Sequence, residues 1–243
     1  MTTSRAYDVD LPVDFDVASY DVVADYAIRM ANPNDPAARW NTNAWFGFGT
    51  GWLGFAMRLR SAMEFNEEFG ILIAASPSPG RAEQYKQERA LFACITAALS
   101  SMECFSYATY CLAGAFDDKH FPLSDKRKLR GKSGGSFVDK FKAFNSLDPF
   151  VVRLDMIWDA SEFDALSDLR NALSHRGTLP RKVWFSTVSD LPDTVPFNPK
   201  ALAENFVHDS PLTAEATAGH VLWVTTVLSE LTTEFAEFLM RHT

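Results

Sequence analysis

Apolar residues recur at intervals of three and four along most of the chain, which is the period of an amphipathic α-helix. This spacing predicts helices over residues 17–31, about 81–116, 136–147, 150–158 and 161–176, with a last helix opening at Ser210-Pro211. Polar, glycine-rich or proline-rich stretches separate these segments. The longest segment is long enough to form the spine of a bundle, so we expect an all-α fold of the antiparallel helical-bundle type.

A further apolar stripe lies in the first third of the chain, at Trp45, Phe48, Trp52, Phe55, Leu59 and Met63. Its most apolar window, residues 44–57, is shorter than the roughly 20 residues needed to span a bilayer and contains four glycines. We therefore expect a buried helix with no membrane contact. These aromatic side chains could stack on bases, but helical spacing favours the core or a subunit interface.

Two breaks divide the chain. The sequence SPSPG at 76–80 separates residues 1–80, expected to form an N-terminal helical extension packed on the core, from a bundle of residues 81–243. Residues 178–210 form a proline-rich insert before the last helix, and KVWFSTV within it could be a strand or an extended arm.

Composition bounds the compartment and the chemistry. The 243 residues are 47% hydrophobic and 22% charged, as in folded globular chains. The three cysteines, Cys94, Cys104 and Cys111, lack zinc-site spacing, and their odd number argues against a disulfide framework. The N-terminus is acidic, without the basic-then-apolar order of a signal peptide. A cytoplasmic protein without metal or cofactor is expected.

Charge is unevenly distributed. The net charge of −8 argues against a nucleic-acid partner, yet residues 119–182 carry 13 Lys/Arg against 8 Asp/Glu. Five basic residues fall within seven positions: Lys126, Arg127, Lys128, Arg130 and Lys132. This segment could steer RNA through its phosphates or could be a solvated loop. Gly131-Lys132-Ser133 is not part of a P-loop, because no glycine lies five positions before Gly131.

The helix at 161–176 has two contrasting faces. Phe163, Leu166, Leu169 and Leu173 form the predicted buried face, and Asp168, Asn171 and His175 lie opposite. Arg170 lies on the flank of the apolar face, where its guanidinium needs an acceptor. His175 lies in the last turn, next to the negative end of the helix dipole. Arg170 and His175 differ by about 140° around the helix, so two copies facing each other would make a more compact site than one.

The stretch from Arg170 to His175, RNALSH, resembles the R-x4–6-H motif of the HEPN family, including a polar residue directly after the arginine. The resemblance covers residues 85–242 and implies a bundle of four or five core helices, with the motif near the end of a late one. Many HEPN domains are homodimeric, metal-independent endoribonucleases that act as toxins or antiviral effectors. Others have lost catalysis and serve as binding modules.

If the resemblance holds, Arg170 stabilises the charged phosphorane, His175 moves protons to or from the 2′-hydroxyl and the leaving oxygen, and Asn171 orients them. Cleavage would leave 2′,3′-cyclic phosphate ends. Asp168 and Ser174 are expected to support the site, and Arg176 is expected to join the basic segment in binding RNA. The alternative for His175 is a solvated helix end that the histidine caps.

Glu103 is a candidate partner for Arg170. It lies only about 40° around its helix from Leu99, and a carboxylate that close to an apolar face usually has a cationic partner. The alternative is a side chain in water at the edge of the helix. The other histidines, His120, His208, His220 and His242, show no ligand spacing and are expected in solvent or core.

Three functions remain open. The first is a homodimeric HEPN-type ribonuclease with an RNA substrate, for which a cognate antitoxin or inhibitor protein is a candidate partner. The second is a non-catalytic HEPN-like module that binds a nucleotide or a protein partner. The third is an antitoxin-like or structural helical protein, which the acidic C-terminal quarter favours.

Overall fold

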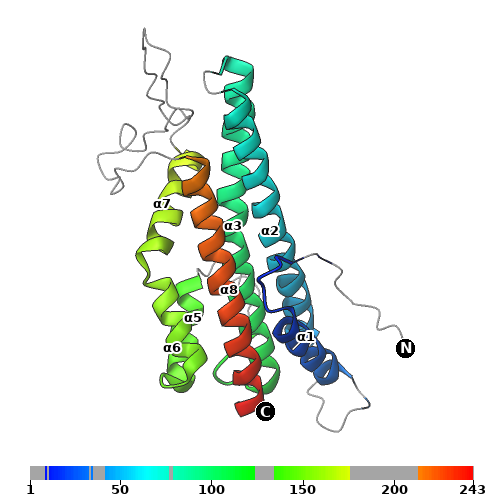
Figure 1. Cartoon of the computed structure of the whole chain (residues 1–243). Coiled ribbons are helices and arrows are strands. Elements are labelled where there is room, and N and C mark those ends of the chain that lie inside the picture. The colour runs from blue at the N-terminus through cyan, green and yellow to red at the C-terminus, as the bar shows by residue number, and fades with distance from the viewer. Residues whose placement is uncertain are drawn as a thin grey trace. The chain divides into compact units, whose positions relative to one another are not determined.

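The computed structural model describes residue 9 and residues 11–32, 34, 42–76, 79–123, 134–175 and 213–242. These residues form seven α-helices and no strand (Figure 1). The helices are α1 (Val17–Ala31), α2 (Thr42–Ala75), α3 (Arg81–Phe116), α5 (Gly134–Asn145), α6 (Pro149–Trp158), α7 (Ser161–His175) and α8 (Ala214–His242). The all-α prediction is confirmed for this part of the chain. The proline-rich insert at 178–210 lies outside the described residues.

Helix positions follow the apolar periodicity closely. The bounds of α1 and α3 are those predicted, and α6 and α7 agree to within one residue. The α5 helix begins and ends two residues earlier than predicted, and α8 begins at Ala214. The aromatic stripe lies on α2, which continues to Ala75, just before the SPSPG break.

The chain divides into two compact units, and the division does not follow the order of the sequence. The first unit contains Met1–Arg58, Ser100–Ala160 and Thr225–Thr243, and the second contains Leu59–Leu99 and Ser161–Val224. Three long helices, α2, α3 and α8, contribute residues to both units. Residues 1–80 are therefore shared between the two units.

Aromatic rings form the core of the first unit. Tyr20 of α1 stacks on Trp52 of α2 at 4.9 Å between ring centroids, and Trp52 lies 5.9 Å from Phe105 of α3. Phe105 in turn contacts Phe235 of α8, which lies 5.0 Å from Phe150 of α6. This series of offset and edge-on contacts joins five helices around one core.

Within this unit, α2 and α3 approach each other closely at a glycine. A Cβ atom on Gly51 would lie 3.1 Å from both the backbone nitrogen of Ala108 and the carbonyl oxygen of Cys104. These backbone atoms cannot rotate away as a flexible side chain could. Gly51 therefore sets how closely the two helices pack.

Asp16 ties α1 to α8 in the same unit. Its carboxylate caps α1 by accepting from the backbone N–H of Ser19 and also accepts from the Thr233 hydroxyl, at 3.1 and 2.8 Å. Its own backbone N–H donates to the Ser229 hydroxyl at 2.8 Å. The hydrogen bonds that Ser19 and Thr233 donate to its carboxylate hold the pKa of Asp16 below its usual value.

The second unit has a mainly aliphatic core with one buried aromatic ring, Phe69. To it α2, α3, α7 and α8 contribute Phe69, Leu91, Ile95, Leu166, Leu169, Val221 and Val224. The fully buried Gln87 of α3 donates to the carbonyl oxygens of Leu72 and Ser76 at 2.9 and 3.0 Å, which satisfies the C-terminal end of α2.

One described helix, α3, is long and apolar enough to span a membrane by length and composition alone. Its most apolar stretch is 56% buried inside the protein. The core helix of a bundle meets the same criterion.

Candidate functional site

The R-x4–6-H motif lies in the last part of α7, whose final residue is His175. Leu166, Leu169 and Ala172 are at most 4% exposed and form the buried face of the helix. Phe163 and Leu173, which we predicted on this face, are only half-buried, and Ala172 is buried where we predicted Leu173. Asp168, Asn171 and Ser174 are exposed. The motif helix thus carries a continuous polar edge in solvent.

Arg170 lies between the two faces, as predicted for the flank, and is half-buried. Its Nε atom is buried and has no hydrogen-bond partner among the residues that the structure describes. We had expected the guanidinium to find an acceptor, and at Nε it finds none. An unsatisfied buried donor costs on the order of 1–3 kcal/mol, more when it belongs to a charged group. A bound anion would supply the missing acceptor.

The remaining residues of the predicted site are described only in part. The backbone of His175 completes α7, but its side chain lies outside the described residues. The same holds for the whole of Arg176 and of the basic segment, Lys126, Arg127, Lys128, Arg130 and Lys132. The structure therefore places Arg170 and Asn171 on one helix end, while the position of the His175 imidazole stays a prediction.

Glu103, the predicted partner of Arg170, lies on α3 in the first unit, whereas Arg170 belongs to the second. Its side chain is exposed, and no hydrogen bond or ion pair within the described residues includes it. Glu103 thus has the exposed position of the alternative, a side chain in water. Without burial, the physical reason for a pairing with Arg170 falls away.

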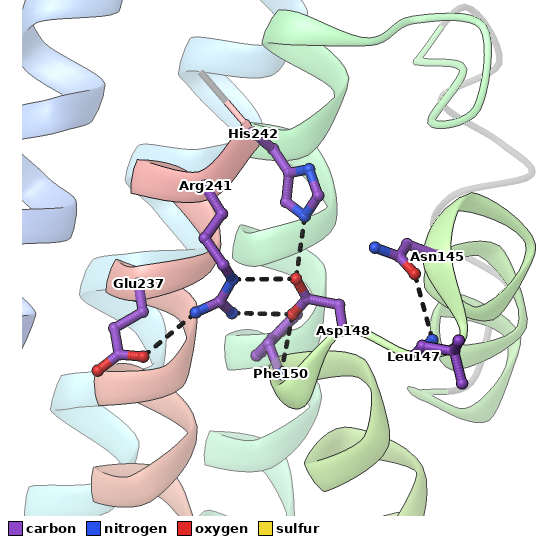
Figure 2. Close-up of polar contacts among 7 residues, drawn as sticks. All are labelled: Asn145, Leu147, Asp148, Phe150, Glu237, Arg241 and His242. Atoms are coloured by element: carbon purple, nitrogen blue, oxygen red, sulfur yellow. Dashed lines mark hydrogen bonds and ion pairs between the residues drawn. The ribbon is translucent and has the colours of Figure 1, made fainter.

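A second arginine and histidine form a polar cluster that the sequence analysis did not predict (Figure 2). Asp148 accepts from the Nε and a terminal nitrogen of Arg241, at 3.1 and 2.9 Å. His242 shares a hydrogen bond with the same carboxylate through Nε2 at 2.9 Å. The side chain of Asp148 is only 2% exposed. This cluster joins the last turn of α8 to the start of α6.

Local sequence explains why the carboxylate lies there. Asp148 is the N-cap of α6, accepts from the backbone N–H of Phe150 at 2.9 Å, and precedes Pro149 in the first turn. An aspartate at the N-cap followed by proline is a favoured way to begin a helix. Arg241 and His242 lie in the last turn of α8, where cations interact favourably with the helix dipole.

Hydrogen bonds within the cluster shift the pKa values of Asp148 and Arg241 toward their charged forms. Burial alone would raise the pKa of Asp148, but hydrogen bonds from Arg241, His242 and Phe150 outweigh it and hold the pKa below its usual value. The hydrogen bond to Asp148 raises the pKa of Arg241. The remaining terminal nitrogen of Arg241 donates to Glu237 at 3.2 Å. Each of the three guanidinium nitrogens thus has a carboxylate partner within the protein.

Two histidines with carboxylate partners flank one ring of the first unit. His120 shares a 2.6 Å hydrogen bond with Asp117, and its ring lies 5.5 Å from Phe144. His242 lies 5.1 Å from Phe144 and 4.6 Å from Phe238. Both histidines lie between the solvent and core positions we expected, with side chains 39% and 22% exposed. These contacts account for both imidazoles by packing and hydrogen bonding.

Each guanidinium nitrogen of Arg241 already has a carboxylate partner in the cluster at Asp148, so we interpret the cluster as a structural latch. Sequence spacing could not reveal it, because Asp148 and His242 are 94 residues apart. Only the N-cap signal at Asp148-Pro149 was readable. Within the described residues, no group of three or more His, Cys, Asp or Glu side chains could hold a metal ion.

Comparisons with family models, with curated proteins and with solved structures find no match for this chain.

Proposed function

We propose that this chain is a metal-independent endoribonuclease of the HEPN type that acts as a homodimer. The observation that carries the proposal is Arg170, near the end of a helix with an otherwise solvated polar edge. Its buried Nε lacks an acceptor within the described part of the chain. The helical fold is consistent with a HEPN-like bundle. A toxin or an antiviral effector, with RNA as substrate, is the corresponding biological role.

In this mechanism the 2′-oxygen attacks the adjacent phosphorus and the 5′-oxygen of the next nucleotide leaves. His175 takes the proton from the 2′-hydroxyl or gives one to the leaving oxygen, and the second copy of His175 supplies the complementary step. Arg170 stabilises the extra negative charge of the phosphorane, and Asn171 orients the reacting groups. The products are a 2′,3′-cyclic phosphate and a 5′-hydroxyl.

The geometry of one helix supports the requirement for a dimer. Because Arg170 and His175 are five residues apart in α7, their side chains leave the helix in directions about 140° apart. Two helices related by a two-fold axis would bring two arginines and two histidines around one phosphate. The basic segment at 126–132 would add contacts to the RNA backbone.

The direct test is to incubate the purified protein with total RNA in the presence of EDTA. Wild type should cleave it and leave cyclic phosphate ends, whereas His175→Ala should be inactive. The matched control is His120→Ala, which removes an imidazole hydrogen-bonded to Asp117 and should retain activity. Cleavage that survives His175→Ala, or that requires a divalent cation, contradicts the proposal.

If neither protein cleaves RNA, the alternative is a non-catalytic HEPN-like module. The orphaned Nε of Arg170 fits that role as well, because a bound nucleotide phosphate would also satisfy it. Binding of labelled nucleotides to wild type but not to Arg170→Ala would then support the module.

A further inference from the structure

The exposed edge of α7 carries one carboxylate that the helix itself does not explain. Asp168 lies in the middle of α7 and is exposed. Asp164 lies four residues earlier, and two like charges at this spacing disfavour the helix. Asp164 belongs to the first turn, where the helix dipole favours an acidic side chain. Asp168 lies beyond that turn and gains no such stabilisation.

No cation on the neighbouring turns of α7 compensates for Asp168. The positions three and four residues away are Asp164, Ala165, Asn171 and Ala172, none of which is basic. Among the residues with described side chains, none forms a hydrogen bond or an ion pair with Asp168. A residue that local rules disfavour is expected where a functional site requires it. We therefore asked what Asp168 could bind.

Asp168 lies on the same edge of α7 as the end of the R-x4–6-H motif. It precedes position 175 by seven residues, which is about 10 Å along the helix axis and about 20° around it. Arg170, near the same helix end, independently points to an anionic ligand, because its buried Nε has no acceptor in the part of the chain with known placement. An RNA phosphate at this end would bring a flanking nucleotide within reach of Asp168.

Charge decides which part of that nucleotide can contact Asp168. A phosphate is negative and is repelled by Asp168 and by Asp164 on the preceding turn. The sugar–phosphate backbone therefore avoids this part of the helix edge. Bases are neutral, and in single-stranded RNA their Watson–Crick edges are open to hydrogen bonds from a protein. Asp168 is thus suited to contact a base.

Hydrogen-bond chemistry then selects the base. An ionised carboxylate has two oxygens and can only accept. The Watson–Crick edge of guanine presents two adjacent donors, N1–H and the N2 amino group. Adenine and cytosine present one amino group beside an acceptor, and uracil presents one N–H between two carbonyls. Guanine alone can therefore donate to both oxygens of one carboxylate.

We propose that Asp168 is a specificity-determining residue that selects guanine next to the scissile phosphate. This inference rests on the proposed function, because it takes the phosphate to lie at the end of α7. The paired hydrogen bonds are charge-assisted and so stronger than those between neutral groups. A base that lacks one of the two donors is rejected, because one carboxylate oxygen then stays unpaired.

The test uses short single-stranded oligoribonucleotides that differ at one position, which is guanosine or inosine. Inosine lacks only the N2 amino group of guanosine. Wild type should cleave next to guanosine about tenfold faster than next to inosine. Asp168→Asn keeps the shape of the side chain but replaces one acceptor with a donor, so the ratio of the two rates should fall to near one. Asp164→Asn, the matched control on the same edge, should keep the wild-type ratio.

Binding distinguishes failure of this inference from failure of the proposed function. Fluorescence anisotropy with His175→Ala compares the two labelled oligonucleotides without any need for cleavage. Tighter binding of the guanosine oligonucleotide, lost when Asp168→Asn is added, supports base selection even if wild type proves inactive, and then the proposed function alone fails. The assignment of Asp168 is overturned if guanosine and inosine are bound and cleaved equally, if Asp168→Asn keeps the preference, or if neither oligonucleotide binds.

Discussion

Arg170 and Arg241 are both partly exposed arginines near the ends of helices, yet their surroundings differ completely. Arg241 has a carboxylate on each of its three guanidinium nitrogens, and it holds α8 against α6. Arg170 has a buried Nε with no partner in the described ranges of the chain. An arginine that is fully satisfied inside the protein contributes to stability. An arginine that costs stability without satisfying its donor is a candidate for binding something else.

The largest expected difference lies in activity. Under the proposed function, Arg170→Ala should lower RNA cleavage at least about a hundredfold, because it removes the group that stabilises the developing negative charge. Arg241→Ala should leave cleavage per folded molecule nearly unchanged. Gel-based cleavage assays with both variants measure this, and comparable losses in the two would erase the distinction between a functional and a structural arginine.

Substitutions in the cluster around Arg241 should lower the free energy of unfolding, although they leave activity nearly unchanged. Asp148→Ala removes the N-cap of α6 and leaves Arg241 and His242 without their buried acceptor, so we expect a loss of about 2–3 kcal/mol in the free energy of unfolding. Urea denaturation measures it. Asp155→Ala, which breaks a more exposed ion pair with Lys142, is the matched control and should cost less than about 1 kcal/mol. Equal losses would mean that Asp148 is no latch.

The unsatisfied Nε of Arg170 predicts that removing the guanidinium does not destabilise the fold and can stabilise it. Replacing Arg170 with methionine keeps an unbranched side chain of similar length and removes the unsatisfied donor. The free energy of unfolding should stay the same or rise by about 1 kcal/mol. Asn171→Ala on the exposed edge provides a control with little expected change. A clear destabilisation by Arg170→Met would indicate that the guanidinium has a structural partner after all.

Acid should weaken the latch. The pKa of Asp148 is lower in the folded chain than its usual value of 3.8, so its ionised form stabilises the fold at higher pH. That contribution is lost as the pH falls below about 3.9, the value for an unfolded chain, and through the folded pKa. Asp16 and Asp117 also have lowered pKa values, so the measurement must isolate Asp148. The stability difference between wild type and Asp148→Asn should therefore shrink as the pH falls through this range. A difference independent of pH would assign the effect to packing.

Local chemistry made most of the helices predictable. The aspartate and proline at 148–149, the SPSPG break and the apolar period each act over a few residues, and the helix bounds follow them. Where packing decides, prediction was less exact: Ala172 takes the buried position expected for Leu173, and Glu103 turns into solvent.

Long-range contacts could not be read from spacing. Nothing in the order of residues indicates that Asp148 would meet Arg241, 93 positions later, or that α6 would bury one apolar face and expose the other. The candidate site was predictable only for the residues that lie on one helix, α7. Arg170 and Asn171 lie where the pattern placed them, whereas the orphaned Nε depends on the tertiary surroundings of Arg170.

The latch also affects how α8 opens. Terminal turns of helices usually fray, and their amides exchange with solvent quickly. Here the last turn of α8 is bonded to the residue that begins α6, and Phe238 and His242 lie against the ring of Phe144. Opening this turn must also expose the carboxylate of Asp148. In hydrogen exchange, the end of α8 should therefore be protected like the interior of the first unit.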